Sequence, residues 1–137
     1  MKAYLSGICK GAVSASTVHV NGICKGKTIK KIKGEVSSQF QYINLIGSYI
    51  DGLKVLRSVV ENDKTVNEVI IETNNSSFRT WLDRGYALPQ YTDIFMELME
   101  LLNDIPVKYE IIYNKELKAK MYAKESYVPK ERLSGID

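Results

Sequence analysis

The chain has 137 residues, of which 45% are hydrophobic and 26% are charged, with three prolines and nine glycines. This composition is typical of one folded domain and excludes collagen-like, low-complexity and disordered chains. No apolar stretch approaches the roughly 18 residues that a membrane-spanning helix needs, and the N-terminus lacks the apolar core of a signal peptide. Two cysteines without such a signal favour free thiols, so we expect a cytoplasmic protein.

Positive charge is concentrated at the start of the chain. The formal net charge is +3, yet residues 1–34 hold seven lysines and no acidic residue, whereas residues 35–137 hold 12 basic and 16 acidic residues. Such asymmetry is typical of a surface that binds polyanions. Lysines on an exposed edge strand also prevent edge-to-edge pairing of sheets, so the sequence leaves both interpretations open.

The first third of the chain predicts three antiparallel strands. The runs 2–9, 12–20 and 27–36 are short, contain β-branched residues and are separated by glycines. Asn21-Gly22 favours a tight hairpin turn between the second and third runs. We therefore expect a meander in this part of the chain.

The middle of the chain changes to a helical period. Apolar residues recur at intervals of three and four from residue 41 to residue 60, which predicts an amphipathic helix. Residues 66–73 contain a short apolar run typical of a buried strand. The run 74–77 offers N-caps for a short helix that contains Trp81, and we expect this tryptophan to be buried rather than available for stacking on a base.

The last third predicts a helix, a strand and a further helix. Thr92 can cap a helix over 93–103, and acidic residues in or beside it have no compensating base: Asp93, Glu97, Glu100 and Asp104. Residues 107–113 alternate as a strand does, and Asn114 can cap a final helix that holds Leu117, Met121 and Ala123. The order predicts an α/β domain over 1–125, followed by a C-terminal tail at 126–137. Its mixed five-stranded sheet has three antiparallel N-terminal strands, then two parallel strands, and is flanked by helices.

Local motifs do not indicate a cofactor. Gly22–Thr28 nearly matches the phosphate-binding loop G-x-x-x-x-G-K-[ST], but it is one residue short and no helix follows. Cys9, His19 and Cys24 are too few for a structural zinc site. A single histidine also gives no hydrolase triad, so we expect no cofactor and no metal.

The element order resembles the ribonuclease H fold over about residues 2–125. The segments that carry the resemblance are Gln41 to Leu53, Glu68 to Asn75, Trp81 with Arg84-Gly85-Tyr86, Asp93 to Tyr113 and Asn114 to Lys124. They are similar, in order, to the family's first helix, its fourth strand with the Thr-Asp-Ser turn, the segment before the next helix, that helix with the fifth strand, and the final helix. The resemblance places the lysine-rich third strand at an edge of the sheet.

Catalysis in that family depends on four carboxylates that bind two Mg²⁺ during phosphodiester hydrolysis. The resemblance places the corresponding positions at Ser6, Tyr42, Asn74 and Lys118, and none of them is acidic. The acids in the neighbourhood, Glu72, Glu116 and Asp51, are too scattered to replace the set. The resemblance therefore implies a ribonuclease H-like domain without catalytic activity.

The sequence leaves three functions open. The first is nucleic-acid binding through the basic first third, with contacts from Lys25, Lys27, Lys30, Lys31 and Lys33. Because side chains alternate along a strand, we expect Lys30 on one face and the other four lysines on the opposite face. The alternative is a protein-interaction or dimerisation module that uses the acidic helix or the sheet edge, and the third is an unusual nuclease.

Overall fold

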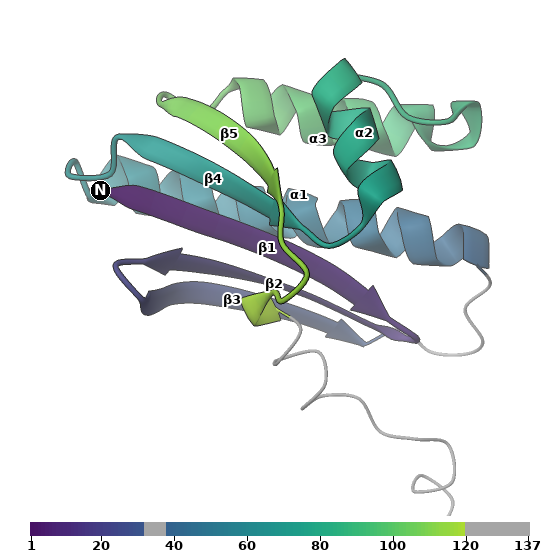
Figure 1. The fold of residues 1–137 in the computed structure, drawn as a ribbon, viewed down its shortest axis with the longest axis horizontal. Coiled ribbons are helices and arrows are strands. Elements are labelled where there is room, and N and C mark those ends of the chain that lie inside the picture. Colours follow the sequence, from purple (N-terminus) through teal and green to yellow (C-terminus); the bar gives the residue numbers. More distant parts are fainter. Residues whose placement is uncertain (32–37, 120–137) are drawn as a thin grey trace, which may run out of the picture.

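The computed structural model describes residues 1–31 and 38–119, with side chains described for residues 1–31 and 41–119. Figure 1 shows one twisted sheet with helices packed against it. The elements are β1 (Lys2–Lys10), β2 (Val13–Val20), β3 (Ile23–Lys31), α1 (Ser38–Asn62), β4 (Glu68–Thr73), α2 (Ser76–Arg84), the 3₁₀ helix η1 (Pro89–Tyr91), α3 (Thr92–Asn103) and β5 (Lys108–Tyr113). In the described ranges, no helix has the length and hydropathy needed to cross a bilayer.

The sheet has the strand order β3-β2-β1-β4-β5. The pairs β1–β2 and β2–β3 are antiparallel, whereas β1–β4 and β4–β5 are parallel. The predicted mixed sheet is therefore confirmed, as is the position of the lysine-rich third strand at an edge. This strand begins at Ile23, directly after the turn, because Asn21 and Gly22 both have positive φ (51° and 76°), which suits a two-residue hairpin. Residues 32–36 of the predicted strand lie outside the described residues.

Helix α1 packs closely against one face of the sheet, and two glycines permit this approach. A Cβ atom on Gly52 of α1 would lie 2.4 Å from Cδ1 of Leu5, and one on Gly7 of β1 would lie 2.6 Å from Oγ of Ser48. Leu5 is fully buried, so it has no open space into which it can move. The helix and the sheet are thus in direct contact along the centre of the core.

Helices α2 and α3 complete the core on the same side as α1. Trp81 is only 4% exposed, which confirms the prediction that it is buried. The prediction that Thr92 caps α3 is wrong, because Thr92 lies within the helix and its hydroxyl donates to the carbonyl oxygen of Pro89 at 2.9 Å. The cause is that η1 runs directly into α3, so the N-cap position falls on Tyr91, whose side chain makes no capping hydrogen bond.

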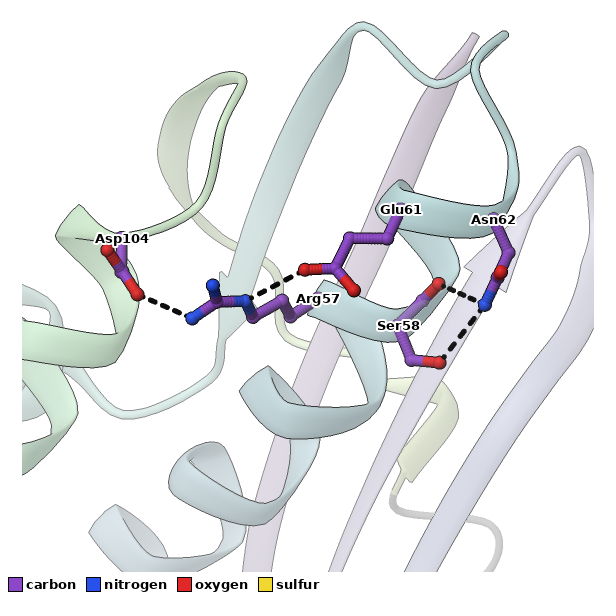
Figure 2. Close-up of polar contacts among 5 residues, drawn as sticks. All are labelled: Arg57, Ser58, Glu61, Asn62 and Asp104. Atoms are coloured by element: carbon purple, nitrogen blue, oxygen red, sulfur yellow. Dashed lines mark hydrogen bonds and ion pairs between the residues drawn. The ribbon is translucent and has the colours of Figure 1, made fainter.

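An arginine on α1 links the helix to the end of α3 (Figure 2). Nη1 of Arg57 lies 2.5 Å from Oδ2 of Asp104, and its Nε lies 3.1 Å from Oε1 of Glu61. Figure 2 also shows the amide of Asn62 donating to the carbonyl oxygen of Ser58 at 2.8 Å. The expectation that the acids around α3 have no compensating base is therefore wrong for Asp104, since the base comes from a helix distant in the sequence.

The segment after β5 crosses in front of β1, on the face of the sheet opposite α1 (Figure 1). There the backbone N–H of Ala119 donates to Oγ of Ser6 at 3.2 Å. Ala119 is fully buried and forms a small apolar cluster with Ile8, Val13 and Ala15. The predicted final-helix residues Met121 and Ala123, and the predicted tail at 126–137, lie outside the described residues.

Candidate functional site

Ser6 lies in the middle of β1 and its hydroxyl is already used in hydrogen bonds. The residue is 3% exposed, and its Oγ lies 3.1 Å from Oγ1 of Thr17 on β2. The same oxygen accepts the hydrogen bond from Ala119. Ser6 therefore connects β1 to β2 and to the segment after β5. At the first expected carboxylate position, the side chain thus has a structural role.

Tyr42 and Asn74 line a common cavity of about 180 Å³. Its lining residues come from the end of β1, from the chain directly after β4 and from the first turns of α1. The lining residues are Ile8, Cys9, Gln41, Tyr42, Leu45, Asn74 and Asn75. The structure thus brings together the second and third expected carboxylate positions, whereas Ser6 and Lys118 are not among the lining residues.

Asn74 and Asn75, which lie between β4 and α2, form one side of this cavity and are held by local hydrogen bonds. The side-chain oxygen of Asn75 accepts a hydrogen bond from the backbone N–H of Phe78 at 2.8 Å, and the backbone N–H of Asn75 donates to Oγ1 of Thr73 at 3.1 Å. Asn75 is therefore the N-cap of α2, as predicted from the run of capping residues. Asn74 directly precedes this cap, so the turn sets the direction in which Asn74 enters the cavity.

Lys118 lies on the other face of the sheet, close to His19. Burial, and then the positive charge of Lys118, lower the pKa of His19. His19 lies in β2 and is 7% exposed, while Lys118 itself is exposed. The fourth expected carboxylate position therefore contributes positive charge beside a buried imidazole.

The acids near these positions have other partners. Oε2 of Glu72 accepts a hydrogen bond from the Asn114 amide at 2.8 Å, and Asp51 forms an ion pair with Lys30 at 3.2 Å. Within residues 1–31 and 38–119, no group of three or more His, Cys, Asp or Glu side chains is placed to hold a metal ion. A hydroxyl, a phenol, an amide and an ammonium group are a poor donor set for the two Mg²⁺ ions of the family, because Mg²⁺ prefers anionic oxygen ligands.

The basic residues of β3 are divided between the two faces of the sheet. Lys27 pairs with Thr17 and Lys31 with Val13, and both follow the face opposite α1. Lys30 lies on the α1 face, where it meets Asp51, as the alternation predicted. Lys33 lies outside the described residues.

Lys25 is on the α1 face, so the prediction that it shares a face with Lys27 and Lys31 is wrong. The register between β2 and β3 shifts after Val18, which leaves Lys25 in a β-bulge. The side chain lines a cavity with the last turns of α1, beside Asp63. Hydrogen bonds from Thr65, and the charge of Lys25, lower the pKa of Asp63.

No family model matches this sequence, and no curated protein matches it. Solved structures are similar in fold. The N-terminal RNase H domain of a Mycobacterium tuberculosis protein aligns with a TM-score of 0.68 at 10% identity, over 90% of this chain and 88% of that chain. RNase H1 from the halophilic archaeon Halobacterium salinarum gives a TM-score of 0.65 at 13% identity, over 91% and 95% of the two chains.

A third similar structure is LC11-RNase H1 in complex with an RNA/DNA hybrid, with a TM-score of 0.64 at 18% identity, over 90% of this chain and 94% of that chain. The three likenesses cover nearly the whole of each chain and agree with the strand order β3-β2-β1-β4-β5. At these identities they establish the architecture and leave the activity to the residues of the site. This chain therefore has the ribonuclease H-like fold.

Proposed function

We propose that this chain is a catalytically inactive ribonuclease H-like domain that binds nucleic acid. The observation that carries the proposal is the occupation of the four expected carboxylate positions by Ser6, Tyr42, Asn74 and Lys118. Two-metal hydrolysis needs anionic ligands that hold both ions against the phosphate. The Ser6 hydroxyl is engaged in hydrogen bonds and the Tyr42 ring in aromatic packing. Both side chains therefore have structural contacts at positions where hydrolysis would need metal ligands.

Nucleic acid is supported as the ligand class by a similar structure and by charge. LC11-RNase H1 was solved with an RNA/DNA hybrid. In this chain, Lys10 and Lys31 are both strand neighbours of Val13 on the face opposite α1, which puts their Cα atoms about 10 Å apart. Lys27 lies on the same face, so three lysines share it, and lysine ammonium groups are the usual partners of backbone phosphates. We call Lys10, Lys27 and Lys31 the basic face.

Two of the lysines expected as phosphate contacts lie on the α1 side of the sheet. Lys30 forms an ion pair with Asp51, and Lys25 lies beside Asp63, so acids of the α1 side offset both charges. We assign the phosphate contacts to Lys27 and Lys31, with Lys10 beside them, because these three lysines share the face opposite α1. Backbone contacts of this kind give little sequence preference.

Fluorescence anisotropy with a labelled RNA/DNA hybrid and with single-stranded RNA tests this proposal. Three or four phosphate contacts predict that log affinity falls against log salt with a slope of about −2 to −4. The double variant Lys27→Glu/Lys31→Glu should bind more weakly and show a shallower slope. Lys54→Glu/Lys64→Glu, at two exposed lysines away from the basic face, makes the same charge change and should retain binding. Equal losses in both variants, or no binding at low salt, would refute the proposal.

A protein-interaction role is the second candidate, favoured by exposed apolar side chains around α3. Met96 is 56% exposed, Leu88 is 42% exposed and Tyr86 is 63% exposed. Asp93 and Glu97 flank Met96 in sequence and would repel a polyanion on this side. If the partner is a second copy, light scattering at high concentration should show a dimer that Met96→Glu disrupts. A strict monomer would remove the homodimer.

A further inference from the structure

We propose that the cavity lined by Tyr42 and Asn74 binds an unpaired nucleobase. This inference rests on the proposed function and specifies which part of the nucleic acid enters the former catalytic position. The cavity volume of about 180 Å³ suits a single planar ring system rather than a larger ligand. The walls of the cavity, its rigidity and its place at the same end of the sheet as Lys10 and Lys31 support the assignment.

Among the described residues, the lining carries no charged side chain: none of the seven is Lys, Arg, His, Asp or Glu. From these seven residues a phosphate group would gain no cationic partner, and a divalent cation would gain no carboxylate. An uncharged ring with hydrogen-bonding edges is the component of a nucleic acid that such walls accept.

Three amide side chains provide the polar contacts. Asn74 and Gln41 each offer an N–H₂ donor and a carbonyl acceptor, which is the combination that proteins use to read base edges. The side-chain oxygen of Asn75 is held by the N–H of Phe78, so its amide nitrogen contributes donors from a fixed position. The cavity therefore presents both donors and acceptors to a base.

The aromatic wall is held in place before any ligand binds. The Tyr42 ring lies 5.1 Å from the Trp81 ring and 5.7 Å from the Tyr91 ring, centroid to centroid. Trp81 and Tyr91 are both buried, so they support Tyr42 from the core. A fixed aromatic side chain lowers the entropic cost of binding, and stacking on such a ring tolerates any base.

Lys10 and Lys31 of the basic face lie at the same end of the sheet as the cavity, on the face opposite α1. Cys9 lines the cavity and directly precedes Lys10, and Lys31 follows two strands away through Val13. A single strand whose base occupies the cavity would pass around the end of β1 to bring its phosphates toward Lys10 and Lys31. A base that is paired in a duplex cannot enter, so the cavity favours single-stranded segments.

The first test is a titration followed by the side-chain amide resonances of the ¹⁵N-labelled protein. Adenosine supplies a base without a phosphate, and ribose 5-phosphate supplies a phosphate without a base. We expect adenosine to shift the resonances of Gln41, Asn74 and Asn75, and ribose 5-phosphate to leave them in place. Absence of a shift with adenosine, or equal shifts with ribose 5-phosphate, would overturn the assignment.

The second test compares two isosteric variants in binding to single-stranded oligo(rA). Asn74→Asp replaces one amide of the cavity with a carboxylate, which cannot donate to a base edge, and should weaken binding by about 5- to 100-fold. Asn67→Asp is the matched control, because Asn67 is exposed at the opposite end of β4 and its oxygen accepts from the N-terminal amine. Equal affinities for the two variants would refute a base in the cavity.

The two proposals fail in different ways. If oligonucleotide binding depends on Lys27 and Lys31 while adenosine and Asn74→Asp have no effect, the cavity assignment is wrong and the proposed function stands. If adenosine shifts the cavity amides while no oligonucleotide binds, the cavity accepts a base but the proposed function is wrong.

Discussion

The ring of Tyr42 lies 5.1 Å from the ring of Trp81, at the position where the ribonuclease H resemblance expects an acidic metal ligand. Tyr91 approaches the same ring at 5.7 Å, and Trp81 in turn contacts Phe95 edge-on. The position therefore belongs to the aromatic packing between α1, α2 and α3. An acidic side chain at residue 42 would lose the ring contacts with Trp81 and Tyr91.

We expect Tyr42→Glu to lower the free energy of unfolding by about 1–3 kcal/mol, since it removes two aromatic pairs of about 0.5–1.5 kcal/mol each. Tyr42→Phe keeps the rings and should stay close to the wild type. Urea unfolding measured by tryptophan fluorescence checks both. A Tyr42→Glu protein as stable as the wild type would show that the packing at this position contributes little.

Two glycines of α1 should respond in opposite ways to the same substitution. A Cβ atom at Gly52 meets Leu5 at 2.4 Å and Ser16 at 3.0 Å, whereas one at Gly47 meets nothing within 4 Å. Gly52→Ala should therefore destabilise the protein by about 1–3 kcal/mol through overpacking. Gly47→Ala should stabilise it by about 0.5–1 kcal/mol through helix propensity. Chemical denaturation gives both values, and destabilisation by Gly47→Ala would contradict the packing described for α1.

Periodicity in the sequence was sufficient to predict the order of elements. The helical stripe from 41 to 60, the hairpin at Asn21-Gly22 and the cap of α2 are each determined by nearby residues, and the structure has all three. Interactions between distant segments could not be predicted in this way. The ion pair of Arg57 with Asp104 joins residues 47 positions apart, so neither helix pattern contains a signal for it.

The candidate site was predicted only in part, because it too depends on contacts between segments that are distant in the sequence. The resemblance placed Tyr42 and Asn74 in one site, and they do line one cavity. Strand alternation placed Lys25 on the wrong face, because the β-bulge depends on the register between β2 and β3 rather than on β3 alone. The roles of Gln41 and Cys9 in the cavity lining had no sequence signal, since both depend on how α1 meets the end of β1.

His19 should make stability depend on pH below about 6.5, the ordinary pKa of histidine. Its pKa in the folded protein is lowered, first by burial and then by Lys118. Below the ordinary value of about 6.5, the unfolded chain therefore binds a proton that the folded protein does not bind, and stability falls as the pH falls. Urea unfolding at pH 7.5 and 5.5 should show this loss in the wild type and a smaller loss in His19→Gln. Equal losses in the two proteins would assign the effect to other groups.

The Arg57–Asp104 pair should contribute a small coupling that salt removes. Both side chains are largely exposed, at 45% and 63%, so water and ions screen the attraction. A double-mutant cycle of Arg57→Gln and Asp104→Asn should give a favourable coupling at low salt that disappears in concentrated sodium chloride. A coupling that is unchanged by salt would contradict the exposure of these two side chains.

The central claim is that this domain binds nucleic acid without cleaving it, and one time course on an RNA/DNA hybrid tests both parts. The hybrid, labelled on its RNA strand, is followed by fluorescence anisotropy after addition of protein with Mg²⁺ or Mn²⁺, and the RNA is then sized on a denaturing gel. We predict that the anisotropy rises, stays at its plateau and leaves the RNA at full length. Anisotropy that never rises would contradict binding, and shortened RNA that Glu72→Gln protects would contradict the loss of catalysis.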